Sequence, residues 1–434
     1  MKALIPPRLT AWGAAWFLGL LGLAALPAAG DPVAATNLSL TEAVTIALRD
    51  NPELAGLRAK AEAMQERPVQ VRTLPNPMLT YSGMDAADGG RWPSTDEKRF
   101  MVEQAFPWFG KRDLREQIAR ADAEIMRHEV ATMTRDVVMM VKEAYFDLCA
   151  VQQVAAITGK EGDVLQRMAK IAETMYTTGQ RTEQDVLKAK AEITMLQQRL
   201  LELAAQENSL KAKLNTLLNR RADAPLGALT EPPPIPDEGR LERFFGLAAA
   251  NRPEVRAEAA RVERYDLERQ LMAKESRPDY RLGLEYRRFG TSDDMLMFTI
   301  GVDLPIWRDS YAAGVREAEK MKASSAAARA AAERRSALDV QDAGFKLQTS
   351  RRTLDLYRKE LIPQAEARFS ASEAGYQTGK VDFMDLLESQ RFLLSARVMT
   401  TMAEGNLGMQ AARLERAVGV DLTGVAAAVE PPPK

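Results

Sequence analysis

The chain has 434 residues, and its 60 acidic and 59 basic side chains leave a formal net charge of −1. That balance gives no electrostatic support for binding nucleic acid, which usually needs a basic face. One cysteine, Cys149, and one histidine, His128, exclude an internal disulfide and the common zinc or triad sites within one chain. We therefore expect no cofactor, no metal site and no enzymatic activity.

The N-terminal segment is predicted to be a secretory signal peptide, residues 1–30. Lys2 and Arg8 make its start positive, and an uncharged apolar run extends to about Pro27, where small residues follow. The run approaches the length that spans a bilayer, so an uncleaved transmembrane helix is the alternative. The small residues favour cleavage near residue 30, which makes 31–434 an exported mature chain.

The first half of the mature chain is predicted to be helix, two strands and a long helical hairpin. A helical pattern covers about 39–73, and alternating segments follow at 77–84 and 99–106. The next stretch, from Gly110 to Gly179, contains no proline. As a helix it would form a rod of about 100 Å at 1.5 Å per residue.

The returning helix, from about Thr182 to Arg220, carries a coiled-coil pattern. Only Glu207 interrupts its apolar series, which alternates steps of three and four residues. A seam of this kind favours a left-handed supercoil with a neighbouring helix. The members of the series are Val186, Ala189, Ile193, Leu196, Leu200, Leu203, Leu210, Leu214 and Leu217.

The second half repeats the first at a spacing of about 200 residues, which indicates an internal duplication. The matches, in chain order, are Asn51-Pro52-Glu53-Leu54 with Arg252-Pro253-Glu254-Val255, Pro77 with Pro278, Phe106-Pro107-Trp108 with Leu304-Pro305-Ile306, Tyr176-Thr177-Thr178-Gly179 with Tyr376-Gln377-Thr378-Gly379, and Asp185 with Asp385.

The two repeats are expected to span about 38–226 and 239–420. A proline-rich linker, 225–239, joins them, and a proline-rich tail, 425–434, ends the chain. Pro363 in the second repeat falls opposite Gly159 and Gly162 in the first. This match predicts that both long helices break at the same height.

Two more strands are predicted near 280–287 and 296–304, which gives four candidate strands. Strands with one apolar face fit an outer-membrane barrel, although a soluble sheet with one buried face shows the same alternation. Trp108, Phe109 and Trp307 stand where strands meet helices, a position typical of a membrane-interface belt. Since four strands cannot close a barrel, any barrel must be shared between protomers.

The motif Leu48–Leu54, the turn Tyr376–Gly379 and the following Asp385-Leu386-Leu387 resemble the TolC-like outer-membrane efflux protein family. The resemblance covers about 38–420. It implies a fold that is mainly α with a small β part. Long antiparallel helical hairpins would form a trimeric α-barrel, and each chain would give four strands to a shared twelve-stranded transmembrane β-barrel.

The same resemblance implies a homotrimer in the outer membrane of a Gram-negative bacterium, in contact with outer-membrane lipid and extending into the periplasm. It would be a passive exit duct that works with a periplasmic adaptor and an inner-membrane pump. The segment Gln104–Lys111 resembles the Pro-aromatic-Gly-Lys segment of the heavy-metal branch, which points to a pump of the resistance–nodulation–division type. Drug or organic-toxin efflux and type I secretion are alternatives for the duct, and a soluble periplasmic coiled-coil adaptor or scaffold is the alternative from another class.

The resemblance also places acidic residues at a constricted periplasmic mouth. Asp385 and Glu388 are three residues apart on one helical face, and a trimer would turn them into two stacked rings of carboxylates. Asp185 matches Asp385 in the first hairpin, and ordinary solvated charges are the alternative interpretation. Family members can carry a basic residue soon after the second turn glycine that helps to tie the closed state. Here Lys380 follows the glycine at once and Val381 comes next, which departs from that pattern.

Overall fold

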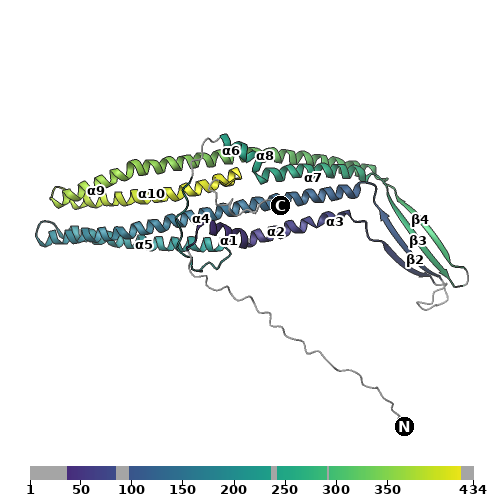
Figure 1. The fold of residues 1–434 in the computed structure, drawn as a ribbon, viewed down its shortest axis with the longest axis horizontal. Helices are drawn as coiled ribbons and strands as arrows, with labels where there is room; N and C mark the ends of the chain where they lie inside the picture. The colour runs from purple at the N-terminus through teal and green to yellow at the C-terminus, as the bar shows by residue number, and fades with distance from the viewer. Residues whose placement is uncertain (1–36, 85–96, 236–241, 291–292, 422–434) are drawn as a thin grey trace, which may run out of the picture.

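The computed structural model describes residues 37–84, 97–235, 242–290 and 293–421. The predicted signal peptide, the C-terminal tail and part of the linker therefore lie outside the described residues. Within them the chain is mainly helical, with one four-stranded sheet at one end of a long body (Figure 1). The predicted fold class, mainly α with a small β part, is confirmed.

The two repeats contain matching elements in the same order. The first comprises α1 (Leu40–Asp50), α2 (Pro52–Gln65), α3 (Arg67–Arg72), β1 (Met78–Met84), β2 (Glu97–Phe106), α4 (Lys111–Thr177) and α5 (Glu183–Leu217). The second comprises α6 (Glu242–Asn251), α7 (Pro253–Glu275), β3 (Asp279–Phe289), β4 (Met295–Asp303), α8 (Arg308–Leu356), the π-helical η1 (Tyr357–Leu361), α9 (Ile362–Gln377) and α10 (Phe383–Val418).

The helical stretch that opens the first repeat is divided by prolines. Pro52 and Pro68 lack a backbone donor, so each stands in the first turn of a new helix and does not continue the previous one. The side chain of Asn51 caps α2, because its Oδ1 accepts from the Leu54 amide at 3.0 Å. Arg252-Pro253 makes the corresponding division between α6 and α7.

The predicted break of the first long helix is wrong. α4 continues through Gly159 and Gly162 for 67 residues, a rod of about 100 Å. Glycine weakens a helix but keeps its amide donor, so the hydrogen-bond ladder survives. Proline has no such donor, and in the second repeat the helix widens into η1 just before Pro363.

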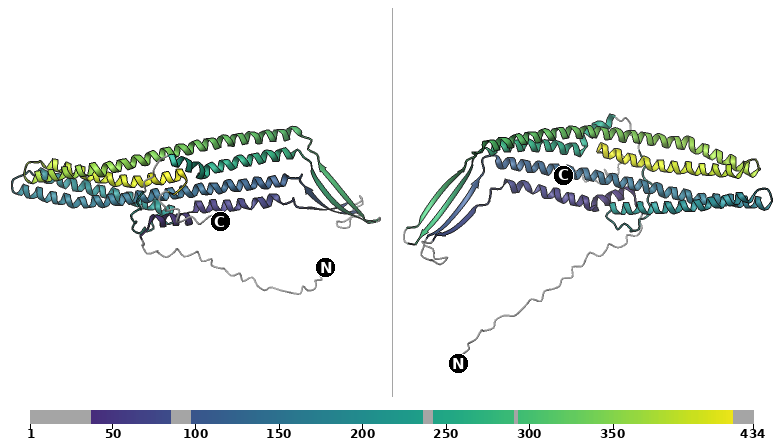
Figure 2. Two further views of the ribbon diagram at one scale, coloured as in Figure 1. Left: turned by 45° about the horizontal axis from the view of Figure 1, so that its top comes forward. Right: turned by 180° about the vertical axis from the view of Figure 1, so that it is seen from behind.

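The helices lie side by side in one curved layer (Figures 1 and 2). In the half next to the sheet the order is α2/α3, α4, α7, α8, and in the other half it is α5, α4, α10, then α8 and α9. α4 crosses both halves and contacts the second repeat along its length. The layer is therefore open at two edges, formed by α2, α3 and α5 on one side and by α8 and α9 on the other.

Ion pairs at a seven-residue spacing join α4 to the second repeat. Carboxylates at this spacing lie along one side of a helix that packs in a coiled coil. Each one meets an arginine of α7 or α10, so the seam between the repeats is held in register by charge. The pairs are Asp122–Arg264 at 2.9 Å, Glu129–Arg261 at 2.8 Å, Asp136–Arg416 at 2.6 Å and Glu143–Arg413 at 2.5 Å.

The four strands form one antiparallel sheet in the order β1-β2-β3-β4, and the β2–β3 pairing joins the two repeats. The register aligns apolar residues of neighbouring strands, with Val102 opposite Leu284 and Leu284 opposite Phe298. All three side chains are exposed. One face of the sheet is therefore apolar, and no other described residues cover it.

Candidate functional site

The two hairpin turns at the far end of the helical body have the same geometry. Gly179 and Gly379 adopt φ of 71° and 75°, a left-handed conformation that favours glycine. The amide of each donates to the carbonyl of the tyrosine three residues earlier, Tyr176 or Tyr376, at 3.0 and 3.1 Å. The turns therefore lie where the sequence motif places them.

The two turn tyrosines differ in their surroundings. Tyr176 is half exposed, whereas Tyr376 is buried against Phe383, with 5.6 Å between the ring centroids. The Tyr376 hydroxyl has no hydrogen-bond partner among the described residues. Burial raises its pKa, and the negative charge of Asp185 raises it further, so the phenol stays neutral.

The three candidate carboxylates do not lie together. Asp385 and Glu388 are both exposed on α10, and Glu388 lies 3.7 Å from Arg368 of α9. Asp185 is buried, with an exposed fraction of 5%, and acts electrostatically on Tyr376. Within one chain, Asp385 and Glu388 are therefore available at the surface, while Asp185 belongs to the packing between the hairpins.

Arg181 joins the two hairpin tips, a role that the sequence reasoning missed. Its Nη2 donates to the carbonyl of Val381 at 3.0 Å, and its Nη1 lies 4.0 Å from a carboxylate oxygen of Asp382. Its guanidinium carbon lies 5.3 Å from the centroid of the Tyr376 ring, a cation–π distance. Arg181 and Val381 hold the same position, two residues after their turn glycines. The difference between arginine and valine at this position was the sequence signal that could have identified Arg181.

The apolar face of the sheet is bordered by aromatic residues at both ends. At the helix end, Trp108 stacks on Tyr280 at 5.8 Å between ring centroids, and Phe109 and Trp307 are 81% and 73% exposed. At the other end a second aromatic row, which the sequence reasoning did not identify, crosses three strands. It consists of Tyr81, Phe100 and Tyr286.

These two rows are six residues apart along β3, or about 20 Å at 3.3 Å per residue. The exposed residues between them include Val102, Leu284, Phe298 and Ile300. An uncovered apolar surface of this extent marks a contact with lipid or protein. Its height is close to the apolar band of about 25 Å in outer-membrane strands.

The opposite face of the sheet is polar and is linked by ion pairs. Arg99 lies directly opposite Arg287 in the β2–β3 register, and Glu97 and Glu285 neutralise both. Arg281 pairs with residues of the neighbouring strands in the same way. The sheet is thus amphipathic, with charges that satisfy one another on one face only.

The lone histidine and the lone cysteine do not form a reactive or metal-binding group. His128 is half-buried 3.1 Å from Glu124, and burial lowers its pKa. Burial raises the pKa of the half-buried Cys149 to about 12. No cluster of three or more histidine, cysteine or acidic residues able to hold a metal occurs in the described ranges. Within those ranges, too, no helix has the length and apolarity to cross a membrane.

Comparison with known proteins defines the class to which this fold and these tips belong. The family model for the outer membrane efflux proteins matches residues 43–220 and 245–420, which correspond to the two repeats. The chain belongs to this family. The match agrees with the recognition made from the turn and helix motifs.

Named relatives and solved structures align with most of this chain. The chain is 24% identical over 397 residues to the cobalt-zinc-cadmium resistance protein CzcC of Cupriavidus metallidurans, covering 89% of this chain and 91% of that protein. The outer membrane protein VceC of Vibrio cholerae superimposes with a TM-score of 0.75 at 17% identity, over 88% of this chain and 96% of VceC. CusC superimposes with a TM-score of 0.75 at 15% identity, over 88% and 92%.

Proposed function

We propose that this protein is the outer-membrane exit duct of a tripartite efflux pump. The observation that carries the proposal is the combination of an uncovered apolar sheet face with a helical body of about 100 Å whose far tips are tied together. The sheet would lie in the membrane, and the helices would extend into the periplasm. Such a duct is passive and catalyses no reaction, since its partner pump supplies the energy.

A homotrimer would cover both the open edges and the unclosed sheet. β1 and β4 are the edges of a sheet with too few strands to close, and three copies would bring twelve strands together. At the edges of the helical layer, Leu187 and Leu201 of α5 are 58% and 73% exposed. On α8, Leu338 and Phe345, seven residues apart, are 63% and 52% exposed. These stripes have the spacing needed to pack between neighbouring protomers.

The hairpin tips would form the periplasmic mouth. In the trimer, Asp385 and Glu388 would make two rings of carboxylates around the axis, where they would attract cations and repel anions. The contacts of Arg181 with the second hairpin hold the two tips of one protomer together. The duct would open when these contacts separate.

We further propose that the cargo is heavy-metal cations and that the partners are a periplasmic adaptor and a pump of the resistance–nodulation–division type. The name of CzcC and the segment Gln104–Lys111 support this assignment. Drugs or organic toxins, and proteins in type I secretion, are the other candidate cargoes. The pump selects the cargo of such a duct, so the chain's own residues discriminate little among these candidates.

Deletion of the gene tests the proposal directly. The deleted strain should lose resistance to cobalt, zinc and cadmium, and the wild-type gene should restore it. Sensitivity to drugs alone would refute the metal assignment while leaving the duct in place. Fractionation and crosslinking test the duct itself, because a soluble monomer would contradict both the membrane location and the trimer.

A further inference from the structure

Two cations on the apolar face of the sheet form no ion pair with another described residue, unlike their counterparts on the polar face. Lys98 of β2 lies directly opposite Arg288 of β3, at the end of the sheet away from the helices. Side chains alternate along a strand, so both share a face with Phe100 and Tyr286, two residues further in. The two cations therefore stand just beyond the aromatic row that ends the apolar belt.

Like charges placed directly opposite each other on neighbouring strands are destabilising. On the polar face the arginine pair at positions 99 and 287 has the same geometry, and Glu97 and Glu285 neutralise it. Neither Lys98 nor Arg288 forms an ion pair or hydrogen bond with another described residue.

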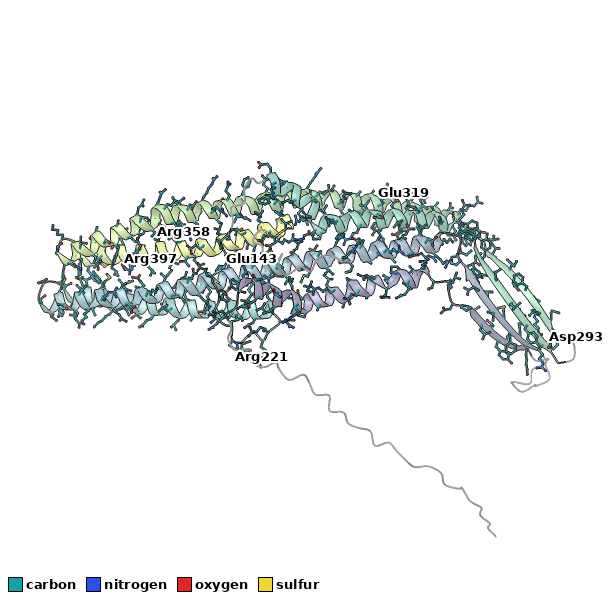
Figure 3. The ribbon with its side chains drawn as sticks, viewed as in Figure 1. Glu143, Arg221, Asp293, Glu319, Arg358 and Arg397 are labelled. Atoms are coloured by element: carbon teal, nitrogen blue, oxygen red, sulfur yellow. The ribbon has the colours of Figure 1, made fainter. Side chains whose placement is uncertain are left out.

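The neighbouring strands differ in what they place beside these cations. Gly83 of β1 lies opposite Lys98 and adds no side chain. On the other side, the Asp294 carboxylate accepts a hydrogen bond from the Tyr286 hydroxyl. Asp293, beside it, marks the far end of the sheet in Figure 3. The site combines two adjacent cations, an aromatic row and an apolar surface. Such a site suits a ligand that has a phosphate at one end and hydrocarbon at the other.

We propose that Lys98 and Arg288 bind the phosphate of a lipid headgroup, and that the lipid's acyl chains lie on the apolar face below the aromatic row. A planar guanidinium beside an ammonium group suits a phosphate, which accepts several charge-assisted hydrogen bonds. This inference rests on the proposed function, which places this end of the sheet at the cell surface. The occupant is therefore a phosphorylated glycolipid of the outer leaflet.

The arrangement differs from that of basic side chains that only extend to the aqueous interface. Long basic side chains near a membrane edge can extend to the interface without a specific partner. Such side chains would not distinguish a phosphorylated lipid from the same lipid without phosphate. Two cations in register, with a glycine beside them, present a defined position for one phosphate.

Native mass spectrometry of the detergent-extracted protein tests the site, with bisphosphorylated lipid A as the probe. We expect the K98Q/R288Q variant to bind this lipid at least tenfold more weakly than the wild type. Dephosphorylated lipid A should bind the wild type as weakly as it binds the variant. The R334Q/R335Q variant removes two positive charges from exposed positions on α8 and should bind like the wild type.

Three results would overturn the proposal. They are equal binding of lipid A by wild type and K98Q/R288Q, equal binding of phosphorylated and dephosphorylated lipid by the wild type, and displacement of lipid A by millimolar inorganic phosphate. Outer-membrane fractionation and crosslinking of the same variants are measured in parallel. If they remain trimeric in the outer membrane while lipid binding is unaffected, the lipid site is refuted and the duct is not.

Discussion

Arg181 of the first hairpin lies over the ring of Tyr376 in the second, 5.3 Å from its centroid, and donates to the carbonyl of Val381 at 3.0 Å. The contact crosses between the repeats at the tip of the body, beside the hydrophobic cluster in which Val186 of the first hairpin packs with Phe383 of the second. Arg181 and Val381 hold the same position after their turn glycines. The cation at this position therefore comes from the first hairpin alone. The two hairpins are thus related by sequence but contribute different side chains to this contact.

Replacing Arg181 with glutamine should loosen the closed tip. The hydrogen bond to a carbonyl and the cation–π contact together are worth about 2 kcal/mol, which is about thirtyfold in an opening equilibrium. We expect a higher single-channel conductance in planar bilayers and greater entry of large antibiotics into cells. Lys170→Gln, which removes an exposed charge near the same tip, should leave both unchanged. Equal conductance of Arg181→Gln and wild type would show that this contact does not hold the mouth closed.

Neutralising the exposed carboxylates of α10 should reduce cation selectivity. Asp385→Asn should have the larger effect, because Arg368 already lies 3.7 Å from Glu388 and offsets part of its charge. Reversal potentials in a salt gradient measure the selectivity, and block by multivalent cations should weaken in parallel. Glu319→Gln makes the same change of charge on α8 near the sheet, far from the tips (Figure 3), and should alter neither. Unchanged selectivity and block in the Asp385→Asn/Glu388→Gln double variant would mean that these residues do not line the mouth.

Local patterns in the sequence predicted the parts of the fold that local physics determines. The heptad from Val186 to Leu217 predicted α5, and the Tyr-x-Thr-Gly motifs predicted both turns. The alternation of β3 and β4 was equally visible. These features depend on residues close together in the chain, so one sequence is sufficient to read them.

The sequence could not predict contacts that depend on packing or on strand register. Arg181 meets Tyr376 because two hairpins lie side by side, and nothing near either residue records that meeting. Lys98 faces Arg288 because β2 and β3 pair in one register, and a shift of a single residue would put it opposite another residue. The break expected at Gly159 failed because a glycine weakens a helix without removing a hydrogen-bond donor.

Close packing where α10 crosses α4 should not tolerate a larger residue. A methyl group added at Gly408 would overlap the ring of Phe146, whose side chain is buried in the core. Gly408→Ala should therefore destabilise the protein by about 1–3 kcal/mol.

Gly56→Ala in α2 is the matched control, since no atom lies within 4 Å of the added carbon. It should stabilise by about 0.5–1 kcal/mol, because alanine favours the helix. Thermal unfolding distinguishes the two, and equal shifts in Tm would contradict the predicted clash.

Glu161 on α4 is a buried carboxyl whose ionisation should oppose folding. It is 3% exposed, and its Oε1 has no hydrogen-bond partner among the described residues. Burial raises its pKa, while Arg397 and Arg167 offset only part of that effect. Because the folded state holds this proton more tightly than the unfolded state, stability from this group is present at low pH. This stability is lost as the pH rises from the pKa of the unfolded state to that of the folded state.

Glu161→Gln should therefore raise the free energy of unfolding at pH 7.5, and the gain should shrink toward pH 4. Glu173→Gln, exposed on the same helix, should show little change at either pH. Urea unfolding at both pH values measures this difference, and a gain that did not depend on pH would argue that ionisation of Glu161 is not its cause.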